Sequence, residues 1–154
     1  MYIVRKIFKF PIGHRLMKHE GLCKNIHGHN LKIEVQVSSK TLSKNDMVID
    51  FKDLKTIVND ILKEFDHCTI FNTWDEENIE YFQKHGYKFT CISSGDADPT
   101  AEMLSRYLFK SIRNKINNTK RDDRYGAFYV PQIINVDFVR VWENDDSMAE
   151  YREI

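Results

Sequence analysis

Two histidines separated by one glycine, His27-Gly28-His29, have the types and spacing that most directly suggest chemistry in this chain. In an extended strand successive side chains point to opposite faces, so both imidazoles share one face. Side chains two apart on a face lie about 6.6 to 7 Å apart, and zinc sits about 2.0 to 2.1 Å from an imidazole nitrogen, so one ion can bridge the pair. A bare His-x-His pair is equally compatible with two ordinary polar residues at a strand end, so further residues have to support the metal site.

The alternation that places the two histidines on one face continues along the chain. Four apolar residues follow on that face: Leu31, Ile33, Val35 and Val37. The pattern predicts a strand from residue 31 to about residue 40 with one buried face, toward which both imidazoles open. Gly28 adds no side chain and suits a bulge or a close backbone approach at the start of this strand.

Length and composition favour a globular protein with a small-molecule partner. The 154 residues fit a single domain, residues 1–154, and the 42% hydrophobic and 30% charged residues are ordinary for such a domain. The 23 basic and 23 acidic residues balance, which gives no electrostatic case for nucleic acid or membrane binding. Charges at Arg5, Lys6 and Lys9 interrupt the apolar start, and three cysteines without close spacing make no disulfide framework, so we expect a cytoplasmic protein.

Periodicity predicts an α+β fold, an antiparallel sheet with two main helices on one face. The first helix covers residues 51–65 with Asp50 as its N-cap, and the second follows Asp98 as N-cap with Pro99 at its first position and continues to residue 116. The predicted strands are residues 2–10, 31–40, 47–49, 87–92, 132–143 and 148–152, of which the second and third form a hairpin. Residues 16–26 are expected to form a loop or lid, and residues 117–127 an exposed loop.

Other residues with acid, base or metal-binding groups stand near the ends of these elements: His14, Cys23, Asp66, His67, Thr100, Glu102 and Glu143. Each has an ordinary alternative when taken alone, namely a structural histidine, a helix C-terminus, an acidic first helical turn or a solvated strand end. The two remaining cysteines and the two remaining histidines are interpreted as residues without a role: Cys68, Cys91, His19 and His85.

Together these residues resemble the 6-pyruvoyl-tetrahydropterin synthase family over about residues 8–152. The motifs that carry the resemblance are His14, Cys23 four residues before His27-Gly28-His29-Asn30, Asp66-His67, Pro99-Thr100-Ala101-Glu102, and Glu143. The four-residue step after the cysteine and the closing run 142–151 resemble the 6-carboxy-tetrahydropterin synthases of the queuosine and deazapurine pathway, since pyruvoyl-forming members usually have a longer step. Residues 73–96 and 117–127 look longer than in compact members.

The resemblance implies a metal centre and a base. His14, His27 and His29 would hold a zinc ion, and three protein nitrogens leave a fourth position open, as in catalytic zinc sites. Cys23 would be the base, because a thiol with a pKa near 8.5 becomes a competent thiolate near neutral pH when a cation lowers that pKa.

The resemblance also implies a proton relay and a pterin pocket. His67 would relay the proton while Asp66 fixes its tautomer, and both are expected in an irregular turn after the first helix. Glu143 would accept two parallel N–H donors of the pterin ring and join the relay. Thr100 and Glu102 would line the pocket, often from a neighbouring subunit.

The fold implied by the resemblance is the tunnelling fold, in which subunit sheets join into a barrel, commonly in a hexamer built from two trimers. The implied reaction is that of a lyase, which converts 7,8-dihydroneopterin triphosphate to 6-carboxy-5,6,7,8-tetrahydropterin, acetaldehyde and triphosphate. Two alternatives stay open: a 6-pyruvoyl-tetrahydropterin synthase, and a non-catalytic zinc or pterin binder. The non-catalytic alternative is disfavoured by the presence of Cys23, Asp66 and His67, because a binding module needs neither a base nor a proton relay.

Overall fold

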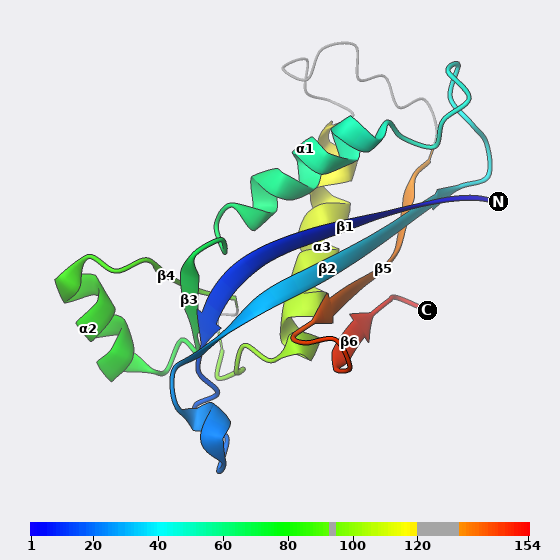
Figure 1. The fold of residues 1–154 in the computed structure, drawn as a ribbon. Helices are drawn as coiled ribbons and strands as arrows, with labels where there is room; N and C mark the ends of the chain where they lie inside the picture. The colour runs from blue at the N-terminus through cyan, green and yellow to red at the C-terminus, as the bar shows by residue number, and fades with distance from the viewer. Residues whose placement is uncertain (93–94, 120–132) are drawn as a thin grey trace.

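The computed structural model describes residues 1–92, 95–119 and 133–154, and it contains one six-stranded sheet with the order β4-β3-β1-β2-β5-β6. Helices α1 and α3 lie side by side on one face of this curled sheet (Figure 1). The α+β class is therefore confirmed. The elements are β1 (Tyr2–His14), a 3₁₀ turn η1 (Leu22–Lys24), β2 (His27–Ser39), α1 (Phe51–Leu62), β3 (Cys68–Phe71), α2 (Glu76–His85), β4 (Phe89–Cys91), α3 (Ala101–Thr119), β5 (Asn135–Trp142) and β6 (Met148–Tyr151).

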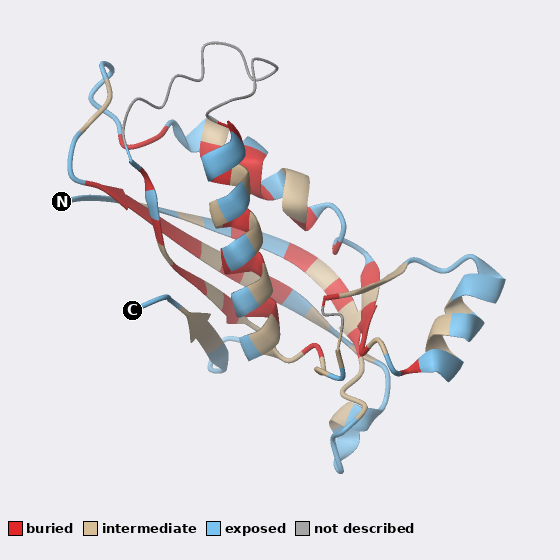
Figure 2. Ribbon diagram, turned by 180° about the vertical axis from the view of Figure 1, so that it is seen from behind, coloured by how far each residue is buried: buried red, intermediate tan, exposed pale blue. Residues whose placement is uncertain are grey.

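Strands β1 and β2 form a long antiparallel pair whose register runs from Tyr2 opposite Ser39 to His14 opposite His27. The alternation expected for β2 is confirmed, since its four apolar residues of that face are at most 1% exposed. Helices α1 and α3 cover this face with their own buried residues (Figure 2). Each fully buried leucine or isoleucine in such a core contributes about 1.5 to 3 kcal/mol.

Strand β1 continues through Pro11, although a strand ending at residue 10 was predicted. The N–H that proline lacks would point to the same side of the strand as its carbonyl, which accepts a hydrogen bond from the backbone N–H of His67 at 3.0 Å. On that side β3 pairs with β1 only from Ile12 to His14. Proline is tolerated here because this part of β1 lies at a sheet edge.

The predicted cap of α1 is confirmed, and that of α3 is wrong. The Asp50 carboxylate accepts the Lys52 N–H at 2.7 Å at the start of α1. At α3 the cap is Thr100, whose side-chain oxygen accepts the Met103 N–H at 3.3 Å, whereas the Asp98 carboxylate bonds elsewhere. Helix α3 runs to residue 119, so the start of the loop expected at 117–127 is helical. The rest of that loop, and residue 132 of the expected long strand, lie outside the described residues.

The sheet is mixed, whereas a wholly antiparallel sheet was predicted. Strand β3 lies parallel to β1, and β4 lies parallel to β3. Strand β3 has only four residues, too few for a periodic signal. Residues 47–49 form no strand, and Val48 and Ile49 pack into the core instead. The short strand predicted at residues 87–92 is present as β4.

A third helix, α2, lies within residues 73–96, where no helix was predicted. None of its residues is fully buried, and it stands apart from the sheet face that α1 and α3 cover (Figure 2). Its apolar residues are Ile79, Tyr81 and Phe82, which span a single turn, so the segment is too short in apolar residues to show a repeating period of 3.6.

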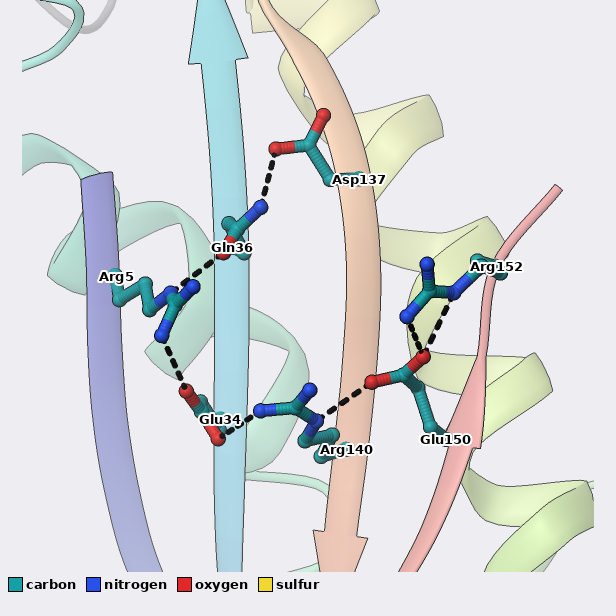
Figure 3. Close-up of polar contacts among 7 residues, drawn as sticks. All are labelled: Arg5, Glu34, Gln36, Asp137, Arg140, Glu150 and Arg152. Atoms are coloured by element: carbon teal, nitrogen blue, oxygen red, sulfur yellow. Dashed lines mark hydrogen bonds and ion pairs between the residues drawn. The ribbon is translucent and has the colours of Figure 1, made fainter. Parts of the chain in front are cut away.

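The sheet face opposite α1 and α3 carries a connected polar network (Figure 3). Glu34 and Gln36 alternate along β2 with the buried apolar residues, as the strand period requires. Arg140 bonds to both Glu34 and Glu150, at 3.2 and 2.6 Å. The network balances three guanidinium groups against three carboxylates: Arg5, Arg140 and Arg152 against Glu34, Asp137 and Glu150.

Among the described residues, no helix is long and apolar enough to cross a bilayer.

Candidate metal centre and active site

Strand pairing brings the three candidate metal ligands together. His14 ends β1 and His27 begins β2, and the two are direct partners in the antiparallel register, while His29 lies opposite Ile12. Their nearest ring nitrogens all lie within 4.8 Å of one another. His14 is 1% exposed and the other two are partly exposed. The cluster therefore sits at the end of the helix-covered sheet face, with one side open.

The tautomers of two of these histidines favour a metal ion between them. Nδ1 of His14 lies 2.9 Å from the Pro99 carbonyl and Nδ1 of His27 lies 2.8 Å from the Asn25 carbonyl. A carbonyl only accepts, so each Nδ1 carries the proton and each Nε2 presents a lone pair. These two Nε2 atoms are 3.0 Å apart. Two lone pairs facing each other repel unless a cation lies between them, and two ligands of a tetrahedral zinc are about 3.3 Å apart.

The burial of His14 suits a metal ligand as well. Burial is the largest effect on this imidazole and lowers its pKa below the usual 6.5, and the neighbouring His27 acts in the same direction. Neutral imidazole is the form that binds metals. The group His14, His27 and His29 can thus hold a metal ion at neutral pH.

Gly28 permits the close approach of the two strands at this centre. A Cβ atom at this position would lie 3.1 Å from the Ile12 carbonyl oxygen. This distance is shorter than an ordinary van der Waals contact, and the neighbouring atom belongs to the backbone, which cannot move aside. A side chain at this position would therefore push β2 away from β1. The close backbone approach expected at Gly28 is confirmed.

A cavity of about 320 Å³ lies at the start of α3, and one of its lining residues approaches the histidine cluster. Its walls come from the start of α3 and from the turn between β5 and β6, and they include three of the predicted site residues: Thr100, Glu102 and Glu143. Glu143 belongs to both places, because its Oε1 lies 3.9 Å from Nε2 of His14. One carboxylate therefore links the cavity to the histidine cluster.

Asp66 and His67 lie in the irregular turn between α1 and β3, as expected. Nδ1 of His67 is 2.8 Å from Oδ1 of Asp66, and His67 has a positive φ of 53°, which is costly for a residue with a side chain. The side chain of His67 is 80% exposed and that of Asp66 is 49% exposed. Asp66 lines a different cavity, between β1 and α1. Within the described chain the pair is thus formed but is separate from the Glu143 cavity.

Cys23 lies on η1, partly exposed, in the segment of residues 15–26, which we name the cysteine loop. Its backbone carbonyl accepts the Leu16 N–H at 3.0 Å. Leu16 lines the cavity that contains Glu143, whereas Cys23 is not among the described residues that form its walls. The structure therefore links the backbone of Cys23 to a residue of the cavity wall, while the thiol itself is not part of that wall.

Sequence reasoning missed several residues of this site. Five further residues line the cavity: Ala101, Leu16, Ser147, Met148 and Ala149. The last three belong to the closing run 142–151, whose resemblance to a family branch was the only available signal. The Pro99 and Asn25 carbonyls that orient two histidines are backbone atoms, which side-chain types cannot indicate.

Alkylation with iodoacetamide at pH 8 should modify Cys23 before the other two cysteines. Burial raises the pKa of the Cys68 thiol to about 11 and also raises that of Cys91. A thiol with a pKa of 11 is ionised about once in a thousand at pH 8, and the thiolate is the reactive form. Peptide mass spectrometry after brief alkylation checks this order, which faster labelling of Cys68 would contradict.

Comparison with known proteins agrees with this geometry. A family model for 6-pyruvoyl tetrahydropterin synthase matches residues 2–154. A 6-carboxy-5,6,7,8-tetrahydropterin synthase of Haemophilus influenzae is 32% identical over 160 residues, which cover 99% of this chain and 100% of the relative. A second enzyme of that name, from Aquifex aeolicus, is 30% identical over 97% of each chain.

The fold agrees as well. The Caenorhabditis elegans 6-pyruvoyl tetrahydropterin synthase superposes with a TM-score of 0.67 at 18% identity, over 99% of this chain and 96% of that chain. The curled mixed sheet with helices on one face is thus the tunnelling-type fold that the resemblance implied. The chain belongs to the 6-pyruvoyl tetrahydropterin synthase family.

Proposed function

We propose that this protein is a zinc-dependent 6-carboxy-5,6,7,8-tetrahydropterin synthase of queuosine biosynthesis. It would convert 7,8-dihydroneopterin triphosphate and one water molecule to 6-carboxytetrahydropterin, acetaldehyde and triphosphate. The observation that carries the proposal is the position of Glu143, which lines the cavity and lies 3.9 Å from His14 in the histidine cluster. The names of the Haemophilus influenzae and Aquifex aeolicus relatives support this product over the pyruvoyl product.

His14, His27 and His29 are the proposed zinc ligands, because their nitrogens converge and two of them have fixed tautomers. Three imidazoles with one open side match a catalytic zinc site better than a closed structural one. Zinc bound there would polarise the side-chain oxygens of the substrate and acidify the adjoining C–H bonds.

Glu143 is the proposed anchor of the pterin ring. Its two carboxylate oxygens can accept the amino group and the ring N–H side by side, which fixes the orientation of the ring in the cavity. Glu102 and Thr100 line the same cavity, so the walls offer acceptors for the polar edge of the pterin. Through its distance to His14, the anchor sets how far the pterin side chain lies from the metal centre.

Cys23 is the proposed base that removes a proton from the substrate side chain. Its loop is bonded to Leu16 of the cavity wall, which supports a thiol position close to the bound substrate. Asp66 and His67 are proposed to relay protons in the site of a neighbouring copy. Their exposure and their place at a separate cavity support a role across a subunit interface.

A homo-oligomer, with a hexamer of two trimers as the expected form, would complete these sites. Within the described residues, residues 2–10 of β1 pair only with β2, so the other edge of β1 is open. Tyr2, Ile3 and Ile7 on this strand are each about half exposed. An open apolar edge is an unfavourable surface that pairing with a strand of another copy would cover.

Incubation of zinc-loaded protein with 7,8-dihydroneopterin triphosphate tests the proposed activity. We expect mass spectrometry to find 6-carboxytetrahydropterin, with acetaldehyde in equal amount by a separate assay. A heat-denatured sample corrects for spontaneous breakdown of the substrate. A pyruvoyl product would overturn the choice of reaction, and unchanged substrate would favour the non-catalytic binder.

A further inference from the structure

Arg15 ties both ends of the cysteine loop to the body of the protein. Its Nε donates to the Lys24 carbonyl at 2.7 Å, at the end of η1. Its Nη1 lies 2.7 and 2.9 Å from the two carboxylate oxygens of Asp75. The Asp75 side chain is only 4% exposed. One guanidinium group therefore connects the start of the loop, the turn that carries Cys23, and a buried carboxylate.

The Asp75 carboxylate serves this contact rather than its own helix. Asp75 is the N-cap residue of α2, a position where aspartate usually accepts a backbone N–H of the first turn. Its side chain makes no such cap bond here and accepts instead from Arg15 and from the Asn78 side-chain amide. A buried ion pair adds little net stability compared with apolar packing, so its main effect here is to fix a position.

A second anchor holds the same loop to the neighbouring segment. The Lys18 N–H donates to the Asp98 carboxylate at 2.8 Å, and its Nζ lies 2.9 Å from the Asp96 carboxylate. Asn72, which is fully buried, donates its amide to Asp98 and to the Asp96 carbonyl, at 2.8 and 2.7 Å. The loop is therefore held on one wall, residues 72–75 and 96–98, whose two parts Asn72 joins.

These contacts hold the backbone that carries the thiol. The Cys23 carbonyl is bonded to Leu16, the residue after Arg15, and Leu16 lines the cavity with Glu143. We infer that Arg15 is a positioning residue, which through Asp75 holds Cys23 in the place from which it removes the substrate proton. The role in proton transfer rests on the proposed function, whereas the hold on the loop does not.

Arg15→Lys is the most informative variant. Lysine keeps a positive charge near Asp75 but cannot contact both carboxylate oxygens and the Lys24 carbonyl with one planar group. Arg15→Ala would leave the buried Asp75 charge unpaired and could unfold the loop region, so Asp75→Asn serves as the second variant. Arg113→Lys is the matched control, because Arg113 pairs with Glu153 in an ion pair that is about two-fifths exposed on the far part of α3.

Hydrogen exchange and kinetics on the full zinc-loaded protein test the inference. In Arg15→Lys and Asp75→Asn we expect peptides of residues 15–26 to exchange about tenfold faster, as for the loss of a charge-assisted hydrogen bond. We expect kcat to fall about 10- to 100-fold while KM stays within about twofold, because a displaced base lowers the rate without changing the cavity that binds substrate. Zinc content and the Arg113→Lys variant should match the parent.

Each outcome separates the inference from the proposed function. Unchanged exchange of residues 15–26 in Arg15→Lys would overturn the hold on the loop, and a loosened loop with parental kcat would overturn the positioning role. If the parent protein turns over no pterin triphosphate, the proposed function fails. In that case the hydrogen-exchange rates of residues 15–26 and the alkylation rate of Cys23 decide the inference by themselves. A change of both rates in Arg15→Lys, but not in Arg113→Lys, supports the inference.

Discussion

Replacing Cys23 by alanine should lower turnover of 7,8-dihydroneopterin triphosphate about 10²- to 10⁴-fold, the usual contribution of a general base. The fold and the metal content should stay those of the parent protein. The thiol is partly exposed, and the loop that carries it is held by the Cys23 carbonyl and by Arg15 rather than by the sulfur. Steady-state kinetics, zinc analysis and the thermal unfolding midpoint check the three parts of this result.

Two further cysteine variants sharpen this experiment. Cys23→Ser should be as inactive as Cys23→Ala, because a serine hydroxyl is far less acidic than a thiol and does not ionise near neutral pH. Cys91→Ala is the control, since this cysteine lies on β4, where burial raises the pKa of its thiol. Near-parental activity of Cys23→Ala would remove Cys23 from the role of base.

Replacing His27 by alanine should abolish stoichiometric zinc binding and, with it, turnover. The loss of a supporting hydrogen bond to a ligand already weakens metal binding about 10- to 100-fold, and the loss of a ligand should cost more. His27 is the direct strand partner of His14, and its Nε2 lies 3.0 Å from that of His14, so its removal leaves only two imidazoles in the cluster. Elemental analysis of the dialysed protein measures the zinc content per chain.

The control for this variant is His85→Ala. His85 lies on α2, bonds to the Tyr81 carbonyl through Nδ1, and stacks on Tyr87, away from the metal centre. It should keep full zinc and full activity. If His27→Ala binds zinc as tightly as the parent, the three histidines are not the ligand set.

The sequence predicted those features that depend on neighbours along the chain. Alternation over residues 27–37 gave the buried face of β2 and the shared face of His27 and His29, because the strand period is a local property. The three- and four-residue steps of α1, and its Asp50 cap, are local in the same way. The position of Asp66 and His67 in a turn followed from where that helix ends.

Elements without a local period were not predicted. Strand β3 has only four residues, and the apolar residues of α2 span a single turn, so neither shows a repeating hydrophobic period. The sequence predicted that β1 ends before Pro11, yet the strand continues through it. Proline lacks a backbone N–H, and no strand pairs with β1 at this position on that side, so no hydrogen bond is lost. Whether an edge is open depends on which strand lies beside it, and that is a property of the sheet.

By itself the sequence determined the family, one face of β2 and the residue types that can bind metal and move protons. Only the tertiary structure decided which of these residues meet. The register of β1 and β2 places His14 opposite His27, and the turn before α3 brings the Pro99 carbonyl to His14. The contact of Arg15 with Asp75 spans 60 residues. Such contacts depend on the packing of distant segments, so no spacing along the chain can reveal them.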